Sequence, residues 1–206
     1  MQISQELAKE LLTIKAVQIN PKEYFTWASG IKSPIYCDNR ITMSYPEVRK
    51  TIANAFVELV EQMEEKPDVI AGCATAGIPH AAWLSERLNL PMVYVRSKPK
   101  GHGKGNQIEG ENVAGKKVLV IEDLISTGGS SLEAVNALRN SGARVLEVLS
   151  IFTYGLRKAQ ANFKSSDMNY QSLTNYEELI QALVEDGKLS EEEKTVLLEW
   201  RNTIDL

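Results

Sequence analysis

Apolar residues along the chain first repeat at helical spacing and later gather in short runs separated by polar turns. Apolar positions three or four residues apart predict helices over 3–16 and from Pro46 to about Met63, with the proline in a favoured first-turn position. Further along, the pattern predicts strands over 68–73, 92–96, 117–121 and 144–152 and helices over 78–88 and 131–140. Strands that alternate with helices are typical of an α/β fold with a parallel sheet and right-handed crossovers.

Two less regular parts flank this alternating region. Residues 17–45 contain short strands around a Ser-Gly turn, whereas the tail from about Thr174 is helical and acidic. No internal repeat or linker separates these parts. We therefore expect a single domain over 1–206, with an N-terminal helix and appendage over 1–45, a core over 46–160 and a helical tail over 161–206.

The composition narrows the class of protein. Charged residues make up 24% and hydrophobic residues 43% of the 206 residues, which is typical of a folded domain with a substantial core. A net charge of −4 predicts no general attraction to nucleic acid or anionic membranes. The N-terminus is polar, no apolar run approaches the ~20 residues of a membrane span, and Cys37 and Cys73 have no metal or disulfide spacing. We expect a cytoplasmic protein.

The most informative segment is residues 118–131. A short apolar strand leads into Glu122 and Asp123, and a turn rich in Ser, Thr and Gly then leads into a helix. Backbone N–H groups and the dipole at a helix N-terminus attract anions, and Gly128 and Gly129 let a ligand come close to the backbone. Further donors are the hydroxyls of Ser126, Thr127, Ser130 and Ser131. The segment therefore predicts an anion site of the phosphate-binding kind.

The two acids refine this prediction. They stand at the carboxyl end of a strand, where open α/β sheets bind ligands. Acids beside a phosphate site suit a molecule with both phosphate and vicinal hydroxyls, together with a hydrated Mg²⁺ ion. The segment has neither the Gly-Lys-Ser/Thr ending of a Walker A loop nor a G-x-G-x-x-G fingerprint. An ordinary capped turn would explain the glycines and serines, but not the paired acids.

A basic, glycine-laced loop follows the strand predicted over 92–96. Its side chains of interest are Arg96, Lys98, Lys100, His102 and Lys104, interspersed with Gly101, Gly103 and Gly105. Such a loop can close over a polyanion, expel water and strengthen each charge contact. The alternative is a solvated hairpin tip whose lysines serve solubility.

Three segments resemble one known family. The run 118–131 resembles the phosphoribosyl pyrophosphate (PRPP) motif of the type I phosphoribosyltransferases. Residues 25–34 resemble the hood of the orotate phosphoribosyltransferases, and residues 70–79 are similar to the family's pyrophosphate loop. The resemblance covers residues 1 to about 160 and points to the short bacterial orotate type. It implies a twisted, mainly parallel sheet flanked by helices, with a small N-terminal hood over a PRPP-binding core.

The resemblance also implies an activity and its residues. The activity is transfer of the phosphoribosyl group of PRPP to orotate, which gives orotidine 5′-monophosphate and pyrophosphate in de novo pyrimidine (UMP) biosynthesis. The catalytic residues implied are Arg96, Lys100, His102 and Asp123. The PRPP-binding residues implied are Arg96, Lys100, His102, Glu122, Asp123, Leu124, Ile125, Ser126, Thr127, Gly128, Gly129 and Ser130. Ser126 is placed near orotate, and Mg²⁺ binds through PRPP, with Glu122 and Asp123 as candidate ligands. The family also implies a homodimer whose basic loop reaches the partner's site.

The chain departs from the family at cationic positions. Many relatives carry lysine where Ala28, Ala76 and Ser97 stand here, and an arginine in the segment 152–155. Two alternatives stay open: a purine or uracil phosphoribosyltransferase, and a PRPP-sensing regulator that binds DNA or RNA. The intact basic loop and the net charge of −4 argue against the regulator. Packing roles are expected for His80, Trp83, Trp200 and Cys73.

Overall fold

The computed structural model describes residues 2–27, 30–97 and 107–204. Its helices are α1 (Gln2–Thr13), η1 (Asn39–Ser44, a 3-10 helix), α2 (Pro46–Gln62), α3 (Gly77–Leu88), α4 (Gly129–Asn140), α5 (Arg157–Ser165), α6 (Tyr176–Glu185) and α7 (Glu191–Thr203). Its strands are β1 (Val17–Ile19), β2 (Phe25–Thr26), β3 (Lys32–Ser33), β4 (Ile35–Cys37), β5 (Val69–Cys73), β6 (Met92–Val95), β7 (Ile108–Glu109), β8 (Lys117–Ile125), β9 (Arg144–Thr153) and β10 (Tyr170–Asn175).

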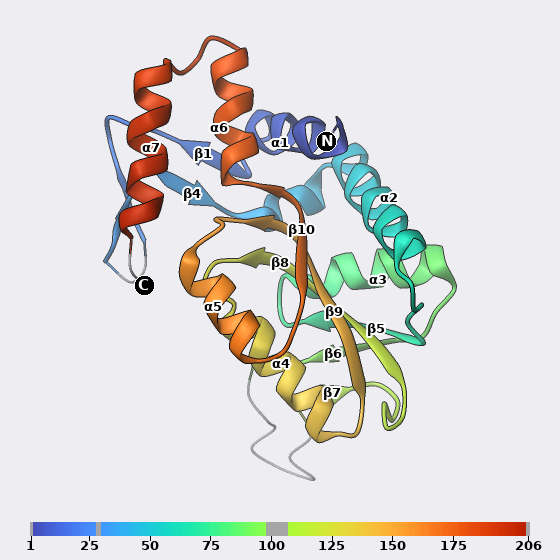
Figure 1. The fold of residues 1–206 in the computed structure, drawn as a ribbon. Coiled ribbons are helices and arrows are strands. Elements are labelled where there is room, and N and C mark those ends of the chain that lie inside the picture. Colours follow the sequence, from blue (N-terminus) through green and yellow to red (C-terminus); the bar gives the residue numbers. More distant parts are fainter. Residues whose placement is uncertain (1, 28–29, 98–106, 205–206) are drawn as a thin grey trace.

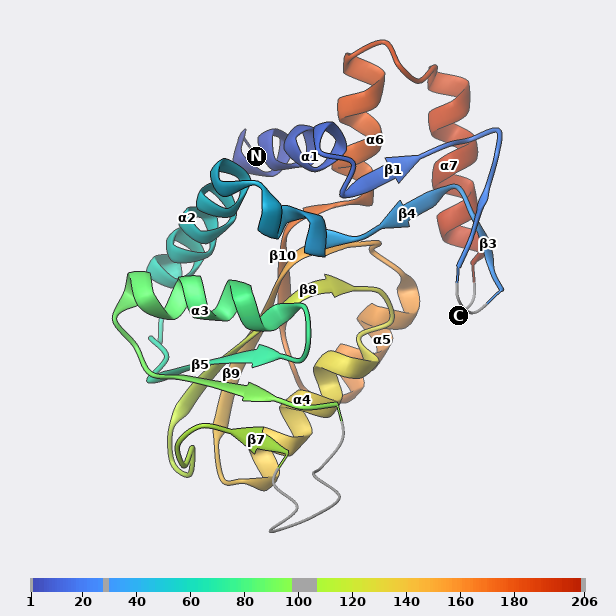
Figure 2. The ribbon, with the colours of Figure 1, turned by 180° about the vertical axis from the view of Figure 1, so that it is seen from behind.

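The central sheet has six strands in the order β10-β9-β8-β5-β6-β7. Every pair is parallel except β6 with the short edge strand β7, which runs antiparallel. Helices α4 and α5 lie on one face, and α2 and α3 on the other (Figures 1 and 2). This twisted, mainly parallel sheet flanked by helices confirms the predicted fold class.

The central strand β8 shows why the sheet is stable. Val118 and Val120 belong to the apolar cluster under α4, whereas Leu119 and Ile121 belong to the cluster on the opposite face. All four side chains are fully buried, which explains why the strand is a continuous apolar run rather than an alternating one. Each such side chain stabilises the fold by about 1.5–3 kcal/mol on burial.

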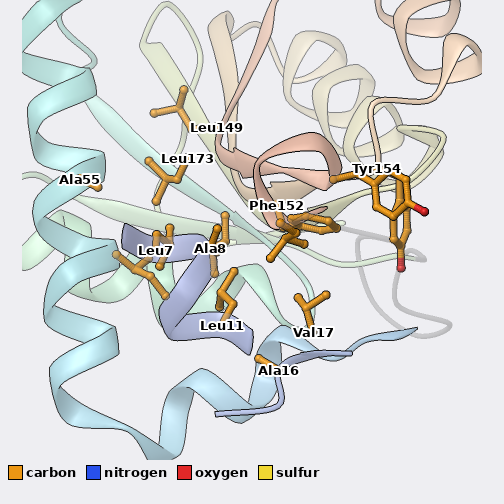
Figure 3. Packing of buried hydrophobic residues seen from close by; sticks show 14 of the residues in the cluster. Leu7, Ala8, Leu11, Ala16, Val17, Ala55, Leu149, Phe152, Tyr154 and Leu173 are labelled. Atoms are coloured by element: carbon orange, nitrogen blue, oxygen red, sulfur yellow. The ribbon is translucent and has the colours of Figure 1, made fainter. Parts of the chain in front are cut away.

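The N-terminal and C-terminal parts pack together at one end of the sheet. The antiparallel pairs β1–β4 and β2–β3 form the hood, and α6 and α7 lie beside it (Figure 1). Leu7 and Leu11 of α1 reach the same apolar cluster as Phe152 and Leu173 at the end of the sheet (Figure 3). The tail therefore forms one core with the N-terminal helix.

The structure contains elements that the sequence pattern did not reveal. Helix α5 and strands β7 and β10 were not predicted, and β10 extends the sheet beyond residue 160. The polar segment over 170–175 forms an edge strand that buries few side chains, so its apolar signal is weak. Within the described part of the chain, no helix is long and apolar enough to cross a membrane.

Candidate active site

The paired acids lie inside the last part of β8. The strand was predicted to end at Ile121, but it continues to Ile125 and carries both carboxylates. Glu122 is only 6% exposed and accepts hydrogen bonds from the Asp123 N–H at 3.1 Å and from the hydroxyls of Ser130 and Ser131, both at 3.4 Å. The structure therefore places Glu122, one of the two predicted acids, within hydrogen-bond distance of two of the predicted hydroxyls at the start of α4.

Burial changes the acidity of both carboxyl groups. Loss of solvent, and next the charge of Asp123, raise the pKa of Glu122 to about 8. Burial also raises the pKa of Asp123, which is half-buried. The pair therefore holds a proton more readily than ordinary carboxyl groups do. A bound cation or a further hydroxyl donor would favour the charged form of the pair.

The turn from Ile125 to Gly128 is held by residues that sequence reasoning missed. Asn162 of α5 donates its side-chain amide to the carbonyl of Thr127 at 3.0 Å. Thr153 at the end of β9 donates its hydroxyl to the carbonyl of Ile125, also at 3.0 Å. Neither residue stands in a recognisable motif, because both act from segments distant in sequence.

The two turn glycines have different roles. Gly128 has a φ of +82°, and a Cβ there would lie 2.4 Å from the ring of Phe163. Gly129 begins α4, two residues before the predicted start at Ser131, and its Cβ would meet only the Thr127 hydroxyl at 3.9 Å. The left-handed conformation is therefore required at Gly128, whereas Gly129 leaves open space beside the helix N-terminus.

A second loop, between β5 and α3, packs against β8, the strand that carries Glu122 and Asp123. Gly77, the first residue of α3, packs so closely on β8 that a Cβ would lie 2.4 Å from the carbonyl oxygen of Ile121. Ala76 precedes it, and the peptide bond between Ala74 and Thr75 is cis. The segment predicted to be the pyrophosphate loop, residues 70–79, therefore borders the strand that carries the acids.

Arg96 follows directly after β6. Its guanidinium Nη1 lies 3.5 Å from Glu109 Oε1, and its backbone N–H donates to the carbonyl of Gln107 at 2.9 Å. The Gln107 amide returns a bond to the Arg96 carbonyl at 2.8 Å. These contacts bring the two ends of the basic loop together. The loop residues 98–106, including Lys100 and His102, and the position of Ala28 lie outside the described residues.

The hood reaches the site through an aromatic pair. Trp27 donates its indole N–H to the carbonyl of Ile35 at 2.9 Å, and its ring centroid lies 5.3 Å from that of Tyr154. Tyr154 is 4% exposed. Its pKa is raised by burial and by neighbouring groups, among them Asp123. An aromatic contact therefore joins the hood to the residue that follows β9.

The residues expected to pack do so. Burial lowers the pKa of His80 to about 4, so its ring is neutral at pH 7. Trp83 lies under the guanidinium of Arg49 at 5.0 Å, and Trp200 meets Trp27 edge to face. Cys73 is buried, and its pKa is raised mainly by that burial. None of the four has the surroundings of a nucleophile or general base.

The acids also fit the family's metal. Among residues 2–27, 30–97 and 107–204, no three His, Cys, Asp or Glu side chains gather as a ligand set. Mg²⁺ binds through one or two carboxylates together with substrate phosphates and water, rather than through a full protein cage. Glu122 and Asp123, beside the turn predicted to hold phosphate, would supply two such carboxylates.

Comparison with known proteins agrees with this geometry. Residues 44–185 match the phosphoribosyl transferase domain family. The fold and site thus define a type I phosphoribosyltransferase. Orotate phosphoribosyltransferase of Oceanobacillus iheyensis is 65% identical over 202 residues, which cover 98% of this chain and 100% of that protein. The Enterococcus faecalis V583 enzyme of the same name is 58% identical, covering 97% and 95%. The chain belongs to the orotate phosphoribosyltransferase family, which confirms the predicted resemblance.

Solved structures support the same assignment. The crystal structure of orotate phosphoribosyltransferase from Aeropyrum pernix aligns with a TM-score of 0.76 at 29% identity, over 89% of this chain and 99% of that one. Leishmania donovani UMP synthase aligns with a TM-score of 0.78 at 28% identity, over 96% of this chain and 42% of that longer one. The family fold therefore extends over nearly the whole chain, including the hood and the tail.

Proposed function

We propose that the protein transfers the phosphoribosyl group of PRPP to orotate, giving orotidine 5′-monophosphate and pyrophosphate in de novo pyrimidine biosynthesis. The observation that carries the proposal is the pair of neighbouring acids Glu122 and Asp123, of which Glu122 accepts hydrogen bonds from the Ser130 and Ser131 hydroxyls at the N-terminus of α4. A pentose 5-phosphate offers both vicinal hydroxyls and a phosphate, so one ligand can satisfy both halves of the site.

The site residues divide between the two ends of the sugar. The carboxylates of Glu122 and Asp123 accept hydrogen bonds from the ribose hydroxyls. The 5′-phosphate binds the backbone N–H groups and hydroxyls of the turn, formed by Leu124, Ile125, Ser126, Thr127, Gly128, Gly129 and Ser130. Ser126 also borders orotate. Both ends of the ribose phosphate are thereby fixed relative to the reacting carbon.

The reaction exchanges one bond at the anomeric carbon of ribose for another. The bond to the pyrophosphate oxygen breaks and that oxygen keeps the electron pair, while a ring nitrogen of orotate forms the new bond and loses its proton to solvent. The transition state resembles an oxocarbenium ion, so negative charge gathers on the leaving pyrophosphate. Arg96, Lys100 and His102 stabilise that charge, and Lys100 and His102 can donate a proton to it.

The proposal extends to the metal, the assembly and the location. Mg²⁺ bound through PRPP, with Glu122 and Asp123 as candidate ligands, would neutralise part of the pyrophosphate charge. The 1–45 hood, the 46–160 core and the 161–206 tail act as one domain. Two copies form a homodimer in which the basic loop of each reaches the partner's site, and the enzyme works in the cytoplasm.

A direct assay tests the reaction and the acceptor. Purified protein with PRPP and Mg²⁺ is mixed with orotate, and loss of orotate is followed by ultraviolet absorbance. Hypoxanthine, adenine and uracil are run as alternative acceptors under the same conditions. Orotate should be consumed fastest, with pyrophosphate released in equal amount. Faster turnover of another base would reassign the acceptor, and PRPP binding without turnover of any base would indicate a regulator.

A further inference from the structure

A buried polar chain outside the PRPP motif leads to the backbone of Asp123. Its members are Asn39 and Thr42 of η1 and His80 of α3, which are 0%, 0% and 2% exposed. The Asn39 amide nitrogen donates to the carbonyl oxygen of Asp123 at 2.8 Å, across 84 positions of sequence. Helix η1 packs against both α2 and β8, in the segment that joins β4 to α2 (Figure 2).

The end of the sheet explains why β8 needs this donor. Strand β5 pairs with β8 only as far as Gly72 opposite Ile121, whereas β8 continues to Ile125. Asp123 therefore lies beyond the last residue that β5 pairs with. A buried carbonyl without a donor costs about 1–3 kcal/mol, and the Asn39 amide satisfies it.

The backbone of Asn39 is held by a second residue of η1. The hydroxyl of Thr42 donates to the backbone carbonyl of Asn39 at 2.6 Å. That hydroxyl has one proton, so its 3.4 Å contact with His80 Nε2 requires the histidine to be the donor. The His80 ring is neutral, with the proton on Nε2. The contacts thus run from His80 to the Thr42 hydroxyl and on to the Asn39 backbone, and the Asn39 side chain then bonds Asp123.

We propose that Asn39 is a positioning residue of the active site, holding the Asp123 backbone so that its carboxylate faces the ribose, with Thr42 and His80 holding Asn39 in turn. This inference rests on the proposed function only in assigning Asp123 to the sugar. The hydrogen bonds link the hood connection, the first turn of α3 and the acid strand. Asn39 is fully buried and reaches the site by its bond to the Asp123 backbone, so its effect passes through Asp123.

The first test replaces Asn39 by leucine, which has similar size and no donor. Carboxylate–hydroxyl bonds strengthen as positive charge develops on the ribose, so we expect kcat to fall about tenfold and KM for orotate to stay within about twofold. Ser44→Ala, at an exposed residue of the same 3-10 helix, is the matched control and should retain wild-type kinetics. A folded Asn39→Leu enzyme with wild-type kcat would overturn the proposal.

A double-mutant cycle separates positioning from simple structural support. If Asn39 acts through Asp123, adding Asn39→Leu to Asp123→Asn should lower the remaining rate by less than about twofold. A full additional tenfold loss would overturn the proposal, because Asn39 would then act elsewhere. Wild-type turnover of orotate is measured alongside, so that absence of the activity itself is distinguished from failure of the positioning role.

Thr42 provides a test that does not depend on folding of the Asn39 variant. Thr42→Val keeps the shape but removes the hydroxyl, whereas Thr42→Ser keeps the hydroxyl. We expect Thr42→Val to lower kcat about three- to tenfold and Thr42→Ser to restore it to near wild type. Equal kcat values for the two variants would overturn the proposed chain.

Discussion

The side-chain amide of Asn162 donates a hydrogen bond to the backbone carbonyl of Thr127 and so joins α5 to the turn expected to hold a phosphate. Replacing Asn162 by leucine removes the donor at similar size. We expect KM for PRPP to rise about three- to tenfold, because the loss of one hydrogen bond lets the turn relax. Steady-state kinetics measure the effect, with exposed Gln160→Ala on the same helix as control. An unchanged KM would mean that the turn keeps its shape without α5.

The neighbouring glycines should fail in different ways. Gly129→Val places a branched side chain in open space at the helix N-terminus, so the enzyme should fold but lose measurable PRPP binding. Gly128→Ala forces a φ of +82° on a residue with a Cβ and pushes that Cβ against Phe163, so it should lose stability by about 1–3 kcal/mol. Calorimetry with PRPP and thermal melting distinguish the two. Normal PRPP affinity in a folded Gly129→Val enzyme would contradict the phosphate site.

Asp123 should be needed for turnover but not for folding. In Asp123→Asn one carboxylate oxygen becomes an amide nitrogen that cannot accept a ribose hydroxyl, and bonds to a charged group are worth about 1.5–3 kcal/mol. We expect kcat/KM to fall about ten- to a hundredfold or more with little change in Tm. The exposed Glu111→Gln variant is the control for loss of a negative charge. Near wild-type kcat/KM would remove Asp123 from the site.

Glu122 should make the ligand-free enzyme less stable as pH rises. Its pKa in the folded state is about 8, against 4.5 for an ordinary glutamate, so folding favours the protonated form. The contribution of this group to the free energy of unfolding is fully present below about pH 4.5 and is lost as the pH rises toward 8. The loss is at most on the order of 3–5 kcal/mol, because one pKa unit is worth about 1.4 kcal/mol.

Glu122→Gln is the variant that isolates this effect. A neutral amide cannot ionise. The free energy of unfolding of the variant should therefore fall less between pH 5 and pH 8 than that of the wild type. Denaturant unfolding at several pH values, without PRPP or metal, measures the difference between variant and wild type. If the free energies of unfolding of the two proteins changed with pH in parallel, burial would not raise the pKa of Glu122.

A shared site predicts that two inactive enzymes recover activity when mixed. Lys100→Ala damages the basic loop and Asp123→Asn damages the acid strand. In a mixed dimer with loops exchanged, one site collects both lesions and the other collects none. Activity should therefore rise toward one wild-type site per heterodimer after subunit exchange. If the loop and the acids of each site came from the same subunit, every site would keep one lesion and mixing would restore no activity.

The control mixes two lesions on the same side of the site. Glu122→Gln and Asp123→Asn both affect the acid strand, so every site of their mixed dimer keeps one lesion and no recovery is expected. Native mass spectrometry verifies that heterodimers have formed. Verified heterodimers of Lys100→Ala with Asp123→Asn that stay inactive would reject the shared site but not the chemistry.

The sequence by itself determined the parts whose signal is local. Alternating strands and helices follow from apolar spacing, because each element must bury one face or both. The acid pair, the hydroxyls and the glycines of 122–131 lie close together in the chain, so their meeting at a strand–helix junction follows from their order alone. The resemblance to the orotate enzymes also rested on short contiguous segments, and comparison with relatives confirmed it.

Only the tertiary structure decided which distant residues support that junction. Asn39 and Asn162 reach the backbone of Asp123 and Thr127 from 84 and 35 positions away, through single amide groups that leave no sequence pattern. The left-handed residue proved to be Gly128 rather than its neighbour, and Phe163 of α5 leaves no room for a Cβ there. Such contacts depend on how separate elements pack, and packing satisfies buried backbone groups that local sequence does not reveal.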